Sequence, residues 1–160
     1  MFETKTYKRG AIIGACWLHN RIEKVRVLKL RVVSSKNEID MLNRNEQMVH
    51  LAFGASNTDI FRLLQNCPRI RAIQVPAQYR KTLSRAGEMF LVIQGIELIE
   101  GDIWGSRKDV QEYCSINEEV IDRIEQLRST GLDVNEIACA VSKEAQISPE
   151  LIKYVIKQSS

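Results

Sequence analysis

Between residues 30 and 100, short apolar runs alternate with segments whose apolar side chains recur at helical spacing, and this alternation most strongly constrains the fold. The runs at 30–33, 48–53, 70–75 and 96–100 predict strands. Strands that alternate with helices through short connections are joined by right-handed crossovers into a mostly parallel sheet. We therefore predict a three-layer α/β domain over residues 28–115, with a small four-stranded, mostly parallel sheet and flanking helices.

The helices between these strands are marked by capping residues. Ser35 with Glu38, and Ser56 with Asp59, have the spacing of a capping box, in which a hydroxyl and a carboxylate satisfy free N–H groups. A longer helix is predicted between the third and fourth strands, and it ends before Gly95. No glycine-rich fingerprint follows the first strand, so the dinucleotide-binding version of this fold is not supported.

Composition excludes several protein classes. Apolar residues make up 44% of the chain and charged residues 27%, which is typical of a globular protein and not of a disordered one. No apolar run approaches the roughly 20 residues that a membrane-spanning helix requires. Cys16, Cys67, Cys114 and Cys139 are far apart and form no CxxC pair, so we expect a reducing cytoplasm, no structural metal and no cofactor.

The first 27 residues differ from the domain that follows them. They contain one apolar stretch, at 11–18, and no strand or helix period that continues into the expected core. The stretch is too short for the apolar region of a secretory signal. We interpret residues 1–27 as an N-terminal extension that is either disordered or a mis-assigned translation start.

A candidate anion site lies where the predicted strands end. In open α/β sheets, ligands bind at the carboxyl ends of the strands, and helix N-termini favour anions. The residues expected there with hydrogen-bond donors or positive charge are Ser56, Asn57, Thr58, Arg80, Lys81 and Arg107. They predict a pocket for a small anion or a phosphorylated ligand. Ordinary helix capping beside a solvated basic face would produce the same residues, so both interpretations stay open.

Catalytic patterns are sparse. The chain has two histidines, and His50 falls inside a predicted strand, which favours a packed side chain over a general base. No sequence motif of a hydrolase, a metalloprotease or a phosphate-binding loop is present. An enzyme acting on a phosphorylated substrate at Arg80, Lys81 and Asp102 is therefore the least favoured reading, because no general base is evident.

Residues 116–160 read as a separate tail of three helices. The phrase GLDVNEIA at 131–138 resembles the opening of many helix-turn-helix domains, and Pro149 suits the first turn of a third helix. If this tail binds DNA, the third helix would present Ser148, Lys153, Tyr154 and Lys157. The interval from Ile137 to Ser148 is about four residues longer than in the compact motif, which departs from the usual geometry.

The charge of the tail opposes DNA binding. Residues 117–160 hold five basic and eight acidic residues, a net charge of −3, whereas phosphate neutralisation supplies most non-specific affinity for DNA. The alternative is a helical bundle that dimerises, docks a partner or covers the sheet.

Several phrases together resemble a known family. They are LRVVSS at 30–35, VHLAF at 49–53, AIQVP at 72–76, GIEL at 95–98 and EGDIWG at 100–105. They resemble a domain-of-unknown-function family of methanogenic archaea of the Methanosarcina type, over about residues 28–157. The resemblance implies an archaeal, cytoplasmic setting and assigns no functional residue.

These observations lead to a non-enzymatic regulator as the first hypothesis. It would be a DNA-binding transcriptional regulator whose α/β domain senses an anion or a partner, and it could form a homodimer. The alternative is a protein-interaction module whose helical tail dimerises or docks a partner.

Overall fold

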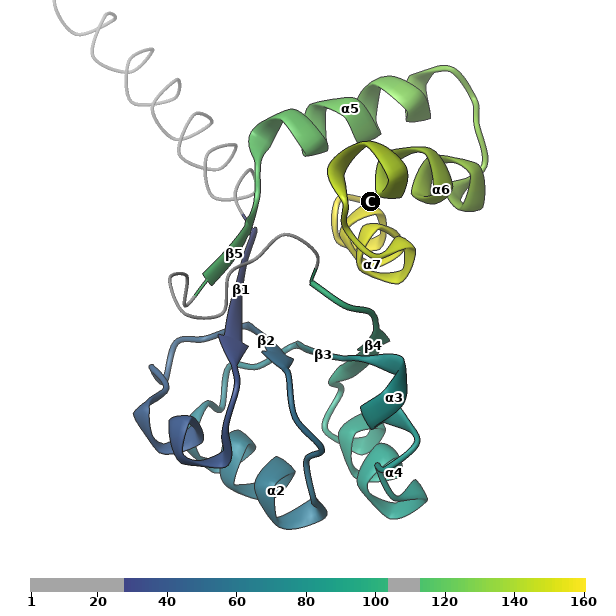
Figure 1. Cartoon of the computed structure of the whole chain (residues 1–160). Coiled ribbons are helices and arrows are strands. Elements are labelled where there is room, and N and C mark those ends of the chain that lie inside the picture. Colours follow the sequence, from purple (N-terminus) through teal and green to yellow (C-terminus); the bar gives the residue numbers. More distant parts are fainter. Residues whose placement is uncertain (1–27, 104–112) are drawn as a thin grey trace, which may run out of the picture.

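The computed structural model describes residues 28–103 and 113–160. A five-stranded sheet lies at its centre, in the order β4-β3-β2-β1-β5 (Figure 1). The strands are β1 (Leu28–Val33), β2 (Met48–Leu51), β3 (Ala72–Val75), β4 (Glu97–Glu100) and β5 (Tyr113–Ile116). Strands β1 to β4 are parallel, which confirms the predicted mixed α/β fold with flanking helices.

The fifth strand was not predicted. β5 runs antiparallel to β1, and Arg31 places its guanidinium 5.1 Å from the centre of the Tyr113 ring. Within Tyr113–Ile116, Ile116 is the buried side chain, so the segment lacks the apolar run by which strands are recognised in sequence. The expected boundary between domain and tail, at residues 115 and 116, falls inside this strand.

The helices between the parallel strands all cover one face of the sheet. They are the 3-10 helix η1 (Lys36–Met41) and the α-helices α2 (Asn57–Asn66), α3 (Ala77–Arg80) and α4 (Arg85–Ile93). Strands that follow each other in one direction through right-handed crossovers place every connection on the same side. Val33, Val49 and Ile73 from the sheet pack there against Ile39, Ile60, Leu63 and Leu91 from the helices.

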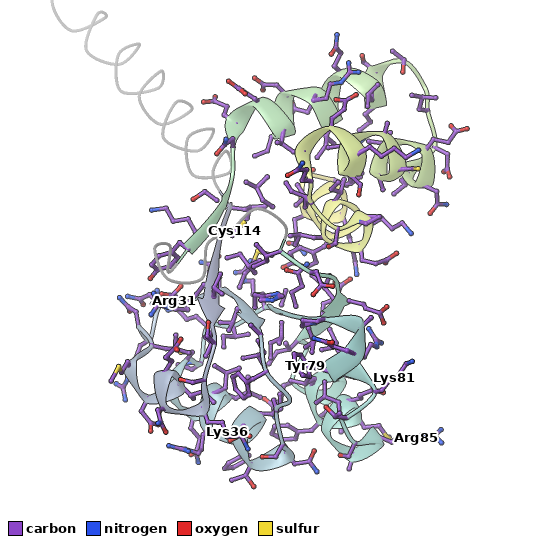
Figure 2. All side chains as sticks on the ribbon, viewed as in Figure 1. Arg31, Lys36, Tyr79, Lys81, Arg85 and Cys114 are labelled. Carbon is purple, nitrogen blue, oxygen red and sulfur yellow. The ribbon has the colours of Figure 1, made fainter. Side chains whose placement is uncertain are left out.

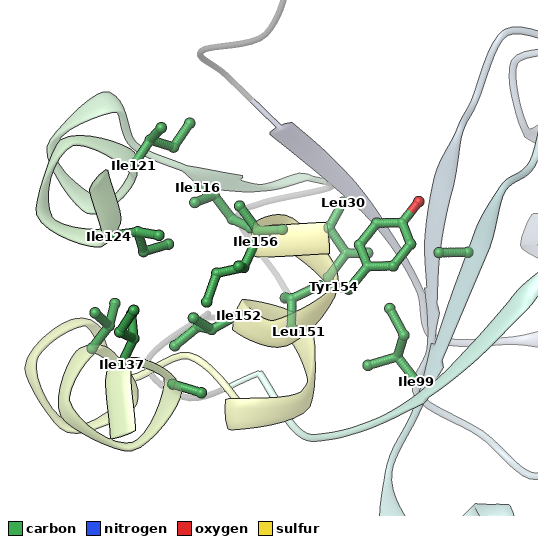
Figure 3. Packing of buried hydrophobic residues seen from close by; sticks show 14 of the residues in the cluster. Leu30, Ile99, Ile116, Ile121, Ile124, Ile137, Leu151, Ile152, Tyr154 and Ile156 are labelled. Carbon is green, nitrogen blue, oxygen red and sulfur yellow. The ribbon is translucent and has the colours of Figure 1, made fainter. Parts of the chain in front are cut away.

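The C-terminal helices cover the opposite face. These helices are α5 (Glu118–Ser129), α6 (Val134–Ala145) and α7 (Pro149–Gln158). Leu30, Met48, Ala72 and Ile99 from the sheet share one apolar cluster with all three of them (Figure 3). The tail therefore supplies the third layer of the fold, which is one of the roles that the sequence left open for it.

Several local predictions are confirmed and two need correction. Ser56 forms a capping box with Asp59, and Pro149 occupies the first turn of α7. A helix does begin after Ser35, as a 3-10 helix, but the predicted capping box with Glu38 does not form: the Ser35 hydroxyl donates to Glu38 Oε1 and caps no backbone N–H. The long helix expected before Gly95 is divided into α3 and α4, because Ser84 caps a new N-terminus by accepting a hydrogen bond from the N–H of Gly87.

The extension predicted over residues 1–27 lies outside the described residues, as does Arg107. None of the helices that the structure describes is both long and apolar enough to cross a membrane.

Candidate functional site

Helix α7 is held between the other tail helices and the sheet (Figure 3). Ile152 lies toward Ile124 of α5 and Ile137 of α6, whereas Tyr154 lies beside Leu30 and Ile99 of the sheet. In a helix-turn-helix domain the third helix usually presents its outer side to the major groove. In this protein, much of that side packs against the sheet.

Two of the four residues predicted to contact DNA are buried. Ser148 is 3% exposed and caps α7, since its Oγ accepts a hydrogen bond from the Leu151 N–H at 3.4 Å. Tyr154 is 4% exposed, and its burial, together with the charge of Glu97, raises the pKa of its phenol. Both side chains position α7 on the sheet in this structure, and neither is open to a duplex.

Of the other two residues on α7, Lys157 is exposed and Lys153 is half-buried. Lys153 Nζ lies 2.9 Å from Glu150 Oε1, and Lys157 Nζ lies 3.1 Å from Glu97 Oε2 on β4. They line a groove of about 500 Å³ between α7 and β4, which Arg80 also reaches. Arg80 Nε lies 3.7 Å from Glu100 Oε2 in the same groove. Each cation of this groove therefore has a carboxylate partner.

Three of the predicted anion-binding residues lie at the start of α2. The N–H and hydroxyl groups of Ser56 donate to Asp59 Oδ2, at 2.9 and 2.7 Å. Burial alone would raise the pKa of Asp59, but these bonds and Lys36 Nζ at 3.2 Å outweigh it, so the pKa is lowered. The first turn of α2 thus already carries an internal carboxylate. Asn57 Oδ1 accepts a bond from Ser84 Oγ at 2.7 Å, and Thr58 is exposed.

Arg80 and Lys81 are brought together, but beside acidic groups. They share an open groove of about 410 Å³ with Glu88 and Glu100. Arg80 Nε lies 4.0 Å from Glu88 Oε1, and Lys81 points outward near α3 (Figure 2). Anion binding at Ser56, Asn57, Thr58, Arg80 and Lys81 stays a prediction, and the described contacts give it no assembled pocket.

The sequence interpretation missed a buried polar chain across the sheet. His50 and Gln74 are paired neighbours on β2 and β3 and are 2% and 1% exposed. His50 Nδ1 lies 3.1 Å from Gln74 Oε1, and Gln74 Nε2 donates to Ser148 Oγ at 2.9 Å. His50 was expected to be packed, but Gln74 was overlooked. A glutamine inside an apolar strand was the available signal, because buried polar groups need partners.

A small cavity adjoins this chain at the carboxyl ends of the parallel strands. Its volume is about 80 Å³, and its polar lining comes from His50, Gln78, Tyr79 and Asp102. Among residues 28–103 and 113–160, no group of three His, Cys, Asp or Glu side chains is placed to hold a metal ion.

Comparison with known proteins gives two matches. Residues 29–112 match a family model described as the N-terminal domain of a family of unknown function, DUF1699. Residues 119–157 match a model described as the C-terminal HTH domain of the DUF1699 proteins, where HTH denotes helix-turn-helix. No curated protein and no solved structure matches the chain.

Proposed function

The chain belongs to the DUF1699 family, and from this premise we propose that it is a DNA-binding transcriptional regulator. One observation carries the proposal: the residues that match the family's C-terminal HTH domain form three consecutive helices. Helices α6 and α7 are joined by residues 146–148, and Gln146 adopts a left-handed conformation, with φ of 56°, that turns the chain sharply.

The DNA contacts in this proposal come from the exposed stripe of α7. Lys153 and Lys157 occupy that stripe, and Arg80 lies across the groove. Ser148 and Tyr154 hold the helix in place from below. A phosphate must compete with Glu150 and Glu97 for the lysines, so the affinity for generic DNA is modest and salt-dependent.

The setting belongs to the same proposal. The phrases quoted from the sequence resemble proteins of methanogenic archaea, and the separated cysteines suit a reducing compartment. We accordingly place the regulator in an archaeal cytoplasm, with the sheet as its sensing part.

Fluorescence anisotropy with a labelled generic duplex tests the function, using the full chain at low and moderate salt. We expect binding that weakens with salt. Lys157→Gln should weaken it and reduce the slope of log K against log salt by about 0.9, the value for one lost phosphate contact. Glu97→Gln should act in the opposite direction, because it removes the carboxylate that pairs with Lys157.

Lys29→Gln is the matched control. It makes the same change of charge on β1, which is separated from β4 by two strands, and should leave the slope unchanged. Absence of salt-dependent binding at low salt would overturn the DNA proposal. If neither Lys157→Gln nor Glu97→Gln changes the affinity for DNA, the contact lies away from α7.

A second candidate function is homodimerisation through the outer surface of α2 and α4. Met89, Val92 and Ile93 recur at helical spacing on α4 and are 59%, 75% and 75% exposed. Phe61 of α2, also exposed, lies 6.0 Å from Phe90, measured between ring centres. Light scattering on eluting protein tests it: Val92→Lys should convert a dimer to a monomer, whereas Gln94→Lys, also exposed on this segment, should not. A monomeric wild-type protein would exclude this function.

A further inference from the structure

The buried polar chain starts at the edge of the sheet where α/β proteins bind ligands. His50, on β2, both lines the 80 Å³ cavity and contacts Gln74. The amide oxygen of Gln74 can only accept a hydrogen bond, so His50 Nδ1 carries the proton in this contact. The same amide then donates through Nε2 to Ser148. The cavity wall and the N-cap of α7 are therefore joined by two hydrogen bonds.

The polar chain is closely packed where it meets the tail. Gly101, which follows β4, lies against it: a Cβ atom there would fall 2.3 Å from Ser148 Oγ and 2.6 Å from Gln74 Nε2. Ser148 Oγ also accepts the Leu151 N–H. A change in the orientation of the Gln74 amide therefore breaks its bond to the serine that caps the first turn of α7.

The lining of the cavity defines the chemistry of an occupant. Asp102 is the carboxylate among the described lining residues, and Arg80 and Lys81 line neighbouring grooves instead. Gln78 and Tyr79 add polar groups, while Val32, Ala52 and Pro76 contribute apolar walls. Since one water molecule takes up roughly 30 Å³ of liquid, the cavity has room for about three waters or a fragment of similar size. Among the described residues that line the cavity, no lysine or arginine accompanies this carboxylate, and its negative charge disfavours an anion.

We propose that this cavity binds a small, uncharged or cationic group that donates hydrogen bonds, such as a primary amide, and that His50, Gln74 and Ser148 transmit its presence to α7. The sensing part of the protein is then this cavity and not the basic grooves. The inference goes beyond DNA binding and does not depend on it, because it concerns only the sheet and the seating of α7.

Acetamide and acetate are suitable probes, because they have the same shape and differ in charge and in donors. Each is titrated into the full-length, ¹⁵N-labelled protein in the millimolar range, and amide shifts are followed by NMR. Acetamide should shift the Ala52 and Tyr79 amides beside the cavity and, with the same dissociation constant, the Leu151 and Ile152 amides of α7. Acetate should leave all four in place.

Gln74→Met tests the transmission, because it keeps the length of the side chain and removes both hydrogen bonds. Acetamide should still shift Ala52 and Tyr79 in this variant, but no longer Leu151. Ser148→Ala removes the hydrogen bond at the α7 end of the polar chain, and it replaces Gln74→Met in this test if that variant does not fold. Gln65→Met, at an exposed position on α2, is the matched control and should behave as the wild type.

Three results would overturn the inference. The absence of shifts at Ala52 and Tyr79 would remove the site. Equal shifts with acetate would show that the cavity does not select against a negative charge. Shifts at the cavity that do not reach Leu151 in the wild type, or that reach it unchanged in both Gln74→Met and Ser148→Ala, would remove the transmission.

Discussion

Gln74 of β3 donates a hydrogen bond of 2.9 Å to Ser148, the N-cap of α7, across 74 positions of sequence. This bond ties the sheet to the tail beside the apolar cluster that the two share. A buried amide without its partner costs about 1–3 kcal/mol, so the bond favours one seating of α7 over alternatives that would leave Gln74 unsatisfied. The apolar cluster attaches the tail to the sheet, and this hydrogen bond sets the position of α7 on it.

Gly101→Ala tests how tightly the tail is seated. The new methyl group would overlap Ser148 Oγ and Cβ and Gln74 Nε2, so either α7 or the segment after β4 must shift to relieve the overlap. We expect the free energy of unfolding to fall by about 1–3 kcal/mol, as for other overpacked sites. Denaturant unfolding measures the change. Gly54→Ala is the control, because its methyl group would make ordinary contacts at 3.6 Å and beyond. Equal stability of the two variants would contradict the close packing at Gly101.

Removal of the tail should unfold the sheet. A chain that ends after Ile116 exposes Leu30, Met48 and Ile99, which are all buried beneath the helices. Each large apolar side chain is worth about 1.5–3 kcal/mol when buried, and a whole domain is stable by only about 5–15 kcal/mol. We expect loss of the cooperative melt in circular dichroism, with aggregation on size exclusion. A folded, monomeric product would show that the sheet does not need the tail.

The stability of the fold should depend on pH through Asp59. Burial alone would raise the pKa of Asp59, but the hydrogen bonds of Ser56 and the charge of Lys36 outweigh it, so the pKa in the folded chain lies below the ordinary 3.8. The ionised group therefore stabilises the fold fully above the unfolded value, and this contribution disappears as the pH falls through the folded value. Asp59→Asn should lower the free energy of unfolding at neutral pH by about 0.5–2 kcal/mol, the usual worth of a helix cap.

Denaturant unfolding at a series of pH values measures this effect. The gap between the wild type and Asp59→Asn should narrow below about pH 4, the ordinary range of aspartate. Asp122→Asn, at an exposed position on α5, should not show this narrowing. A gap for Asp59→Asn that stays constant across acid pH would mean that the carboxylate is not held in its charged form.

The cysteines should differ in reactivity. Burial raises the pKa of the Cys67 thiol, with Glu46 adding to the effect, and Sγ donates to the Asn43 carbonyl oxygen at 3.3 Å. Cys139 is exposed on α6. Since the thiolate is the reactive form, iodoacetamide should modify Cys139 well before Cys67, as measured by peptide mass spectrometry. In urea the two rates should converge. Early modification of Cys67 in the native protein would contradict its buried position.

Most of the helical layer and the parallel strands could be predicted from the sequence. The apolar runs are short and regular, and Ser56, Asp133 and Pro149 mark helix starts by local chemistry that operates without tertiary contacts. The tail was predicted as three helices for the same reason. Local patterns were sufficient at these helix starts, although the cap at Ser84, which separates α3 from α4, was overlooked.

The rest depends on contacts between distant segments. β5 is stabilised by its pairing with β1, and the Tyr113 ring packs against the Arg31 guanidinium. No local sequence pattern around residue 113 predicts either contact. Ser148 and Tyr154 were assigned to DNA because they lie on the expected third helix. Strands β1 to β4 of the sheet that covers them lie more than forty residues away in sequence. Besides its lysine-bearing side, α7 has two apolar sides. The sequence alone does not show which of them packs on the sheet and which on α5 and α6.

Amide hydrogen exchange gives the most direct test of the central claim, that the tail and the sheet form one core. If they do, the amides of Tyr154 and Val155 in α7 should open with the same free energy as those of Ile73 and Gln74 in β3, close to that of global unfolding. Exchange of α7 at a much lower opening free energy than β3, with the strand still protected, would show a tail that leaves the sheet on its own and would contradict the account.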